Sequence, residues 1–394
     1  MAVVDGPRYP AMWNFRNEAS MRTVSVTLVT YTYDDHELVR GLLSSITGWT
    51  AMPSAIVVVD DGSAEPFTPD LPEEVTERLP DIEVLRVPEN RGNTHARALG
   101  AARASTRFIL SVDADIRFPA HWLAVCLPAA ARPGVGMAGT AIRPRTGDDL
   151  LSRYLELTYT LNRGAAGSVP FLPGGAWLAR RDAFEAVGGF SGYEERFGQD
   201  AYLSRRLRDN GYLLWAVGGV EAFEVRRIGR LQMVRRGWRW QGHHMKAALD
   251  EGRPLDEVLN VVLYSMRDRM LRSRAADPRL LYFDLLYALH ALFDTVAHAA
   301  QTMGQVGGQF GGQTGGQSGG EGPRAALRHS AAAFLKPWPQ LCTALCADLA
   351  ELGHAPLPTD LAAAPPFDLA AALSFAVGAD EMDAVCGGLG EVLG

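Results

Sequence analysis

The sequence predicts an α/β fold with a mostly parallel central sheet, helices on both of its faces, and an α-helical C-terminal region. Short apolar runs rich in β-branched residues alternate with helix-spaced stretches in the first part of the chain, and the alternation stops after about residue 250. Because consecutive parallel strands need a crossover, usually a helix, this order predicts parallel pairing with right-handed crossovers.

The expected strands each run towards a polar segment. The strands are Thr23–Thr30, Ala55–Val59, Ile82–Val87 and the run that begins at Phe108, and the helices between them are Asp35–Ile46 and Thr94–Ala104. The polar segments after the last three strands are Asp60-Asp61-Gly62-Ser63, Asn90-Arg91-Gly92-Asn93 and Asp113-Ala114-Asp115. Since the carboxyl ends of parallel strands meet at one edge of a sheet, we expect these segments to lie together, where α/β sheets bind ligands.

The strand at Phe108 runs directly into two carboxylates, Asp113 and Asp115. Mg²⁺ and Mn²⁺ prefer oxygen ligands and often use one or two protein carboxylates, with water and substrate phosphates completing the shell. An isolated Asp-x-Asp is more often an Asp-rich turn after a strand. The pair predicts a metal site because other polar segments are expected at the same edge.

The composition gives no sign of nucleic-acid binding. Hydrophobic residues make up 47% of the 394 residues and charged residues 21%, which is ordinary for a globular protein, and the net charge is −7. Non-specific binding to nucleic acid needs an excess of basic surface. Any anionic ligand must therefore be met by local groups. Nearly all basic residues are arginines, whose planar fork suits phosphate and carboxylate.

The cysteines and the start of the chain predict a cytoplasmic protein with reduced thiols. The 4 cysteines form no Cys-x-x-Cys pair, and no basic segment followed by an apolar run opens the sequence. The most apolar stretch, Leu280–Ala300, is interrupted by Asp284 and Asp294. We therefore expect an amphipathic helix there and no membrane span.

Five ordered blocks of the sequence resemble the family 2 nucleotide-sugar glycosyltransferases, which have the GT-A fold. The blocks are Val24–Tyr31, Val58–Ser63, Asn90–Asn93 with Ala96-Arg97, Asp113–Asp115, and the stretch Gly174–Trp177, Val187–Phe190, Gln199–Leu203, Arg206-Leu207 and Gly211-Tyr212. Blocks in a fixed order are a much more specific signal than one motif. The resemblance implies an enzyme that moves a sugar from a nucleotide diphosphate sugar to an acceptor, inverting the anomeric centre. The acceptor stays open among natural product, peptide and glycan.

The resemblance implies a nucleotide site at the ends of the first strands. The residues that it assigns to the base, ribose and diphosphate are Thr30, Tyr31, Asp60, Asp61, Arg91, Arg97 and Asp113. A carboxylate that accepts from a base N–H or a ribose hydroxyl makes a charge-assisted hydrogen bond. Taken alone, the Asp-Asp-Gly-Ser segment fits an Asx turn equally well, and an arginine on a helix is more often only solvated.

The resemblance also implies a divalent cation, Mn²⁺ or Mg²⁺, and a catalytic base. The implied cation ligands are Asp113, Asp115 and Glu224. Asp200 is the implied base. It is expected near a helix N-terminus, where the helix dipole favours the carboxylate form. The alternative role for Asp200 is that of an N-cap residue. On the acceptor and sugar side the implied residues are Gly174, Gly175, Trp177 and Gln199.

The sequence departs from the family pattern in ways that keep two other hypotheses open. Val29, Thr32 and Ala98 stand where proline, asparagine and an Arg-Asn pair are usual, and Gln199 stands where an acidic residue is frequent. Gln199 favours a degenerate transferase domain kept as a binding or scaffolding module, although the retained aspartates argue against it. A nucleotidyltransferase would need a Gly-rich basic loop after the first strand, and Thr30–Asp35 is not one.

These patterns predict five segments. Residues 1–21 form an irregular arm, 22–250 the GT-A catalytic domain, 251–302 a helical extension, 303–323 a flexible Gly- and Gln-rich linker, and 324–394 a helical C-terminal region. The helical region matches no chemistry that we can name. It could form a homodimer, dock an acceptor carrier or cap the catalytic domain.

Overall fold

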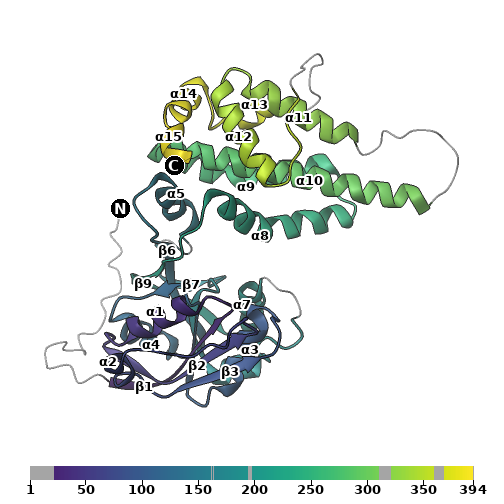
Figure 1. The fold of residues 1–394 in the computed structure, drawn as a ribbon. Helices are drawn as coiled ribbons and strands as arrows, with labels where there is room; N and C mark the ends of the chain where they lie inside the picture. The colour runs from purple at the N-terminus through teal and green to yellow at the C-terminus, as the bar shows by residue number, and fades with distance from the viewer. Residues whose placement is uncertain are drawn as a thin grey trace, which may run out of the picture. The chain divides into compact units, whose positions relative to one another are not determined.

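The computed structural model describes residues 22–160, 162, 164–193, 198–309, 321–358 and 368–393. The predicted arm at 1–21 lies outside these residues. The chain divides into two compact units (Figure 1). The first, here called the sheet unit, is Met1–Ala141 with Gly164–Ala222, and the second, the helical unit, is Ile142–Arg163 with Phe223–Gly394.

The described strands of the sheet form one mixed sheet. Its order is β3-β2-β1-β4-β8-β6-β9-β5, and β7 pairs with β9. The strands are β1 (Arg22–Thr32), β2 (Ala51–Asp61), β3 (Ile82–Val87), β4 (Phe108–Val112), β5 (Ile116–Arg117), β6 (Val135–Pro144), β7 (Gly167–Val169), β8 (Ala176–Arg180) and β9 (Leu213–Glu224). β1, β2, β3 and β4 pair in parallel, while β4 with β8, β6 with β8, and β7 with β9 pair antiparallel.

The strand order reverses at β1, and this reversal creates the ligand edge of the sheet. From β1 the chain passes through α1 (His36–Ile46) to β2 on one side, but from β3 it passes through α3 (Asn93–Arg103) to β4 on the other side. Right-handed crossovers in opposite directions put their helices on opposite faces. The crevice between the carboxyl ends of β1 and β4 is therefore the switch point at which such sheets bind ligands.

Alternating apolar residues hold the helices against the sheet. Val29 of β1 and Val59 of β2 lie in one buried cluster with Ala96 of α3. A Cβ atom on Gly100 of α3 would lie only 2.3 Å from a methyl carbon of Val29, so glycine is what allows this close helix–sheet contact. The other described helices of this unit are α2 (Glu73–Thr76), α4 (Trp122–Ala130), α6 (Arg181–Ala186) and α7 (Gln199–Asp209).

The sequence predicted one domain over 22–250, and the compact units divide it differently. The segment Ile142–Arg163, which contains α5 (Leu150–Tyr159), groups with the helical unit, as does the chain from Phe223 onward. The physical reason is burial, because Leu150, Tyr154 and Leu155 belong to the apolar core of that unit. The boundaries consequently fall inside β6 and β9.

The core of the helical unit is α10 (Leu281–Gln309). Every residue from Leu281 to Leu292 is buried, as expected of a helix enclosed on all sides. The remaining elements are α8 (Arg230–Asp250), α9 (Leu255–Ala276), the 3₁₀ turn η1 (Pro278–Leu280), α11 (Glu321–Leu335), α12 (Pro339–Glu351), α13 (Leu369–Leu373), α14 (Ala379–Gly387) and α15 (Leu389–Leu393).

Both ends of the predicted linker at 303–323 are helical in the structure. α10 continues to Gln309 and α11 begins at Glu321, while 310–320 lie outside the described residues. Once a helix is nucleated and packed, adding a residue costs far less than starting a turn, so α10 extends into the first glycines.

One stretch of the described chain, Pro278–Thr302, is long and apolar enough to cross a membrane by length and composition. Its most apolar window is 89% buried inside the structure. The stretch includes α10, so its apolar surface packs against the other helices of the unit.

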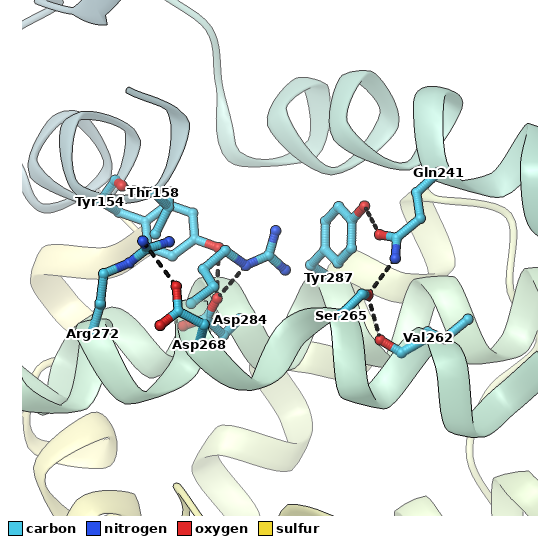
Figure 2. Close-up of polar contacts among 10 residues, drawn as sticks. Tyr154, Thr158, Gln241, Val262, Ser265, Asp268, Arg272, Asp284 and Tyr287 are labelled. Carbon is cyan, nitrogen blue, oxygen red and sulfur yellow. Dashed lines mark hydrogen bonds and ion pairs between the residues drawn. The ribbon is translucent and has the colours of Figure 1, made fainter. Parts of the chain in front are cut away.

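A buried polar network ties α5 to the helical core. Tyr154 of α5 donates to Asp284 of α10 at 2.8 Å, and Arg269 of α9 donates to the same carboxylate oxygen at 2.8 Å (Figure 2). The Arg269 guanidinium also lies 4.1 Å from the ring centroid of Tyr287. Burial raises the pKa of Asp284, and Arg269 opposes that effect.

Replacing Asp284 by Ala should lower the free energy of unfolding by about 3–5 kcal/mol, because it leaves the buried Arg269 charge without its partner. Thermal or denaturant unfolding measures the loss. Asp268→Ala is the matched control, since Asp268 is exposed and forms only an i, i+4 pair with Arg272 on α9; it should change stability by less than about 0.5 kcal/mol. Equal losses in the two variants would show that the buried network contributes no more to the free energy of unfolding than the exposed ion pair.

Candidate active site

The carboxyl ends of β1 and β4 meet through a direct contact between Tyr31 and Asp113. The Tyr31 hydroxyl donates to Oδ1 of Asp113 at 2.8 Å. Tyr31 and Val29 point to the α3 side of the sheet, where both contact the same apolar cluster. The structure thus joins two predicted site residues at the switch point of the sheet.

Arg97 of α3 completes this contact from the helix side. Its Nη2 donates to Oδ1 of Asp113, its Nη1 donates to Ser111 of β4 at 2.7 Å, and its guanidinium carbon lies 5.3 Å from the centroid of the Tyr31 ring. Arg97 is only 2% exposed. A buried arginine needs a negative partner, and Asp113 supplies it.

The electrostatics of this group follow from burial. Burial raises the pKa of the Tyr31 hydroxyl, and the neighbouring Asp113 carboxylate raises it further. Burial alone would lower the pKa of Arg97, but the negative charges of Asp113 and Asp200 raise it. Tyr31 therefore stays a neutral hydrogen-bond donor, and Arg97 stays a fixed positive charge.

Asp60 holds the loop after β2. Its Oδ1 accepts from the Ser63 N–H at 3.0 Å, and its Oδ2 accepts from the Phe67 N–H at 2.9 Å and from Arg86 of β3 at 2.6 Å. Asp60 and Asp61 are the last two residues of β2, in register with Arg86 and Val87 of β3, and do not follow the strand as predicted. Burial opposes ionisation of Asp60, but these hydrogen bonds lower its pKa overall.

Asp61 holds the neighbouring loop. Its two oxygens accept from the backbone N–H groups of Arg91, at 3.1 Å, and Gly92, at 2.8 Å. Gly62 follows with a φ of 78°, and a Cβ there would lie 2.5 Å from the backbone nitrogen of Asn90. The side chain of Arg91 is exposed. The pattern Asp-Asp-Gly thus builds two loops side by side.

Asp115 lies just after Asp113, in the turn that precedes β5. It is 8% exposed, and the turn is closed by the Ile116 N–H, which donates to the Asp113 carbonyl at 3.0 Å. The carboxylate side chain of Asp113 is 28% exposed. Both carboxylates therefore stand at the end of β4, as the sequence predicted.

The Gly174-Gly175 loop connects Asp113 with Asp200. The N–H of Asp113 donates to the Gly175 carbonyl at 2.8 Å, and the N–H of Gly174 donates to Oδ2 of Asp200 at 2.9 Å. A Cβ on Gly174 would lie 3.2 Å from that same oxygen, tighter than most side chains tolerate. Glycine at 174 therefore lets the backbone approach the carboxylate.

Asp200 is the second residue of α7 and is not its N-cap, which is Gly198. Its Oδ1 accepts from the N–H of Ala201 at 2.9 Å. Asp200 is 7% exposed, and burial raises its pKa, while the hydrogen bonds from Ala201 and Gly174 and the charge of Arg97 lower it. The expectation from the sequence rests on the helix dipole and on the neutral neighbour Gln199, and it does not include the effect of burial on the pKa of Asp200.

Several buried polar atoms at this site have no hydrogen-bond partner within the described part of the chain. Among them are Oγ1 of Thr30, Oγ1 of Thr32, Nε of Arg97 and Oε1 of Gln199. Buried polar atoms are nearly always paired, so an unpaired one needs a ligand, a water or another explanation. Thr30 is 0% exposed and Gln199 3% exposed.

Two predicted site residues have side chains that are engaged within their own unit. Trp177, predicted on the acceptor and sugar side, is 2% exposed and packs on Phe184 and Phe190 in the core of the sheet unit. Glu224 belongs to the helical unit, where its carboxylate pairs with Arg236. Over the described residues, no group of three or more His, Cys, Asp or Glu forms a metal-binding cluster.

Ser111 is a site residue that the sequence did not single out. It orients Arg97, and it is the only polar residue of the buried strand Phe108–Val112. A hydroxyl inside a strand that is otherwise apolar was the available signal, because a buried polar group needs a partner.

Comparison with known proteins finds glycosyltransferases similar to about half of the chain. The family model Glycosyl transferase family 2 matches residues 25–188. A pre-mycofactocin glycosyltransferase of Mycobacterium tuberculosis is 29% identical over 218 residues, which cover 53% of this chain and 43% of that protein. Glycosyltransferase AglE of Haloferax volcanii is 23% identical over 193 residues, or 48% of this chain and 63% of that protein.

The chain thus spans about two fifths to two thirds of the length of these relatives. Among solved structures, the mannosyltransferase PcManGT of Pyrobaculum calidifontis in complex with GDP-Man and Mn²⁺ is similar with a TM-score of 0.44 and 20% identity, covering 86% of this chain and 89% of that one.

Proposed function

Residues 25–188 match the model of glycosyl transferase family 2, and from this premise we propose that the chain is a metal-dependent, inverting glycosyltransferase of that family. Its donor is a nucleotide diphosphate sugar, and its acceptor presents a hydroxyl or another nucleophile. One relative is named a pre-mycofactocin glycosyltransferase, which supports pre-mycofactocin or a compound like it as one candidate acceptor.

One observation carries the proposal. A short loop connects the pair of carboxylates at the end of β4 with a separate buried carboxylate on α7. Asp113 and Asp200 bind the two ends of one short loop, through Gly175 and Gly174. Transfer needs two such groups, one where the leaving diphosphate is held and one where the acceptor loses its proton. Close packing of both on one loop fixes their separation.

The residues present fit a divalent cation such as Mn²⁺ or Mg²⁺. Asp113 and Asp115 supply hard carboxylate oxygens at a strand end. A cation held by one or two carboxylates keeps coordination positions for water and phosphate oxygens. A bound cation would act as a Lewis acid on the departing diphosphate. Glu224 as a further ligand is without support, because its carboxylate pairs with Arg236.

Asp200 is proposed as the base. The N–H groups of Gly174 and Ala201 fix both of its oxygens, and the raised pKa makes its carboxylate a better proton acceptor than an exposed aspartate. Gln199 precedes it with an unpaired buried oxygen that suits a hydroxyl donor from the sugar or acceptor. Inversion would follow from direct attack of the activated acceptor on the anomeric carbon.

Release of nucleoside diphosphate from a panel of UDP- and GDP-sugars, assayed with and without Mn²⁺, tests this proposal. We expect Mn²⁺-dependent release, with an anomer of inverted configuration seen by NMR. The neutral Gln199 favours one competing function, a scaffold that binds nucleotides without turnover. Tight Mn²⁺-dependent binding of UDP or GDP with no release from any sugar and acceptor would support the scaffold instead.

A further inference from the structure

We propose that Arg97 is a positioning residue that fixes the Asp113 carboxylate and does not touch the donor. The inference rests on the proposed function, which makes Asp113 a cation ligand. It differs from the role that the family resemblance implied, in which Arg97 meets the nucleotide diphosphate itself.

The first step is the enclosure of the guanidinium. The Arg97 side chain is 1% exposed. One terminal nitrogen donates to Ser111 at 2.7 Å and the other to Asp113, while the Tyr31 ring lies 5.3 Å from the guanidinium carbon. The Nε atom is buried as well and has no hydrogen-bond partner among the described residues. Because the side chain is enclosed and both terminal nitrogens are used inside the protein, the guanidinium offers a diphosphate no solvent-facing edge.

The second step is the orientation of Asp113. Tyr31 on β1 and Arg97 on α3 both donate to the same oxygen, Oδ1. The backbone N–H of Asp113 is held in turn by the Gly175 carbonyl at 2.8 Å. Rotation of the carboxylate would break two hydrogen bonds at once, so its orientation is set before any ligand arrives. Replacing residues that orient metal ligands typically costs about 10–100-fold in metal affinity.

The third step is the contrast with Arg91, which precedes α3. The side chain of Arg91 is exposed, and only its backbone N–H is used, by Asp61. If either Arg91 or Arg97 contacts the diphosphate, the exposed side chain of Arg91 is the one that can reach it. Arg97 instead gives Asp113 an internal counter-charge.

Calorimetric titration with UDP and with GDP, each with and without MnCl₂, tests the assignment in the full chain. Arg97→Met should weaken the Mn²⁺-dependent binding about 10–100-fold and leave the metal-free affinity unchanged. Arg103→Met is the matched control on α3, because Arg103 is half-exposed and pairs only with Glu83; it should change neither affinity. Equal weakening with and without metal would show direct contact with the nucleotide and overturn the proposal.

A double-mutant cycle separates positioning from contact. In an Asp113→Asn background, Arg97→Met should change the Mn²⁺-dependent affinity by less than about 3-fold, since the group it positions is already gone. A full loss in both backgrounds would overturn the proposal. If Arg97→Met does not fold, Tyr31→Phe carries the same cycle, because it keeps the ring and removes only the second donor to Oδ1.

Failure of the proposed function gives a different result. If the wild-type protein binds none of these nucleotides with Mn²⁺, the proposed function is overturned, and the melting temperatures of the same four proteins decide the contact. A double variant that melts close to Asp113→Asn alone supports the positioning role. Fully additive shifts in melting temperature overturn it.

Discussion

Asp200→Asn is expected to reduce sugar transfer about 100-fold or more, because it removes the proposed base from a site that is otherwise kept. Asparagine retains the shape and one oxygen for the N–H of Gly174 or Ala201. The measurement is the transfer rate at saturating donor and acceptor. Asp209→Asn, an exposed position at the other end of α7, is the matched control and should keep the wild-type rate.

The pH dependence of the wild-type protein should agree with this role. Burial raises the pKa of Asp200, so transfer should fall as the pH decreases through that raised value, above the usual range of an aspartate. The free energy of unfolding depends on pH in the opposite direction. A raised pKa in the folded state gives stability that is present below the unfolded-state pKa and is lost as the pH rises through the folded-state pKa.

At neutral pH the buried carboxylate therefore costs stability, and Asp200→Asn should melt no more than about 3 °C below wild type. A large drop in melting temperature would mean that Asp200 serves the fold. Retention of most transfer activity in Asp200→Asn would move the base elsewhere.

Asp115→Ala is expected to abolish Mn²⁺-dependent nucleotide binding, with a loss of more than about 100-fold. Replacing residues that only support a metal ligand already costs about 10–100-fold, so removing a direct ligand should cost more. The fold should survive, because the nearby Arg117 keeps its hydrogen bonds to the carbonyls of Ala114, Ile116 and Leu38. Calorimetry with UDP and GDP in the presence of MnCl₂ measures the effect.

Asp81→Ala is the control for Asp115→Ala. Asp81 is exposed and precedes β3, so it lies at the opposite edge of the parallel strands. It should bind nucleotide and Mn²⁺ as the wild type does. Undiminished affinity in Asp115→Ala would remove the Asp-Ala-Asp segment from the cation site.

The parallel half of the fold and much of the site could be predicted because their signals are local. The β-branched strand with Tyr31 and the apolar strand that ends at Asp113 each carry their own pattern, and parallel pairing brings strand ends together. That Tyr31 and Asp113 share a hydrogen bond follows from the order of β1 and β4, which no local pattern contains.

The structure adds what the sequence does not show where long-range packing decides. Trp177 lies in a strand, Ala176–Arg180, that is buried on both faces, so the sequence shows no alternation to say which side faces the ligand. α5 reads as an ordinary amphipathic helix within the α/β pattern. Its place in the helical unit depends on Tyr154 reaching Asp284, 130 residues away along the chain. The raised pKa of Asp200 likewise comes from burial, which helix position alone does not predict.

The most direct test of the central claim is the release of nucleoside diphosphate from UDP- and GDP-sugars by the wild-type protein, measured with Mn²⁺ and again with excess EDTA. Asp115→Ala is measured in parallel, so that metal dependence of the assay is separated from metal dependence of the site. The account predicts release with Mn²⁺, its loss in EDTA, recovery when Mn²⁺ is restored, and no release by Asp115→Ala under any condition. Equal release in Mn²⁺ and EDTA, or the same Mn²⁺ response in Asp115→Ala as in wild type, would contradict it.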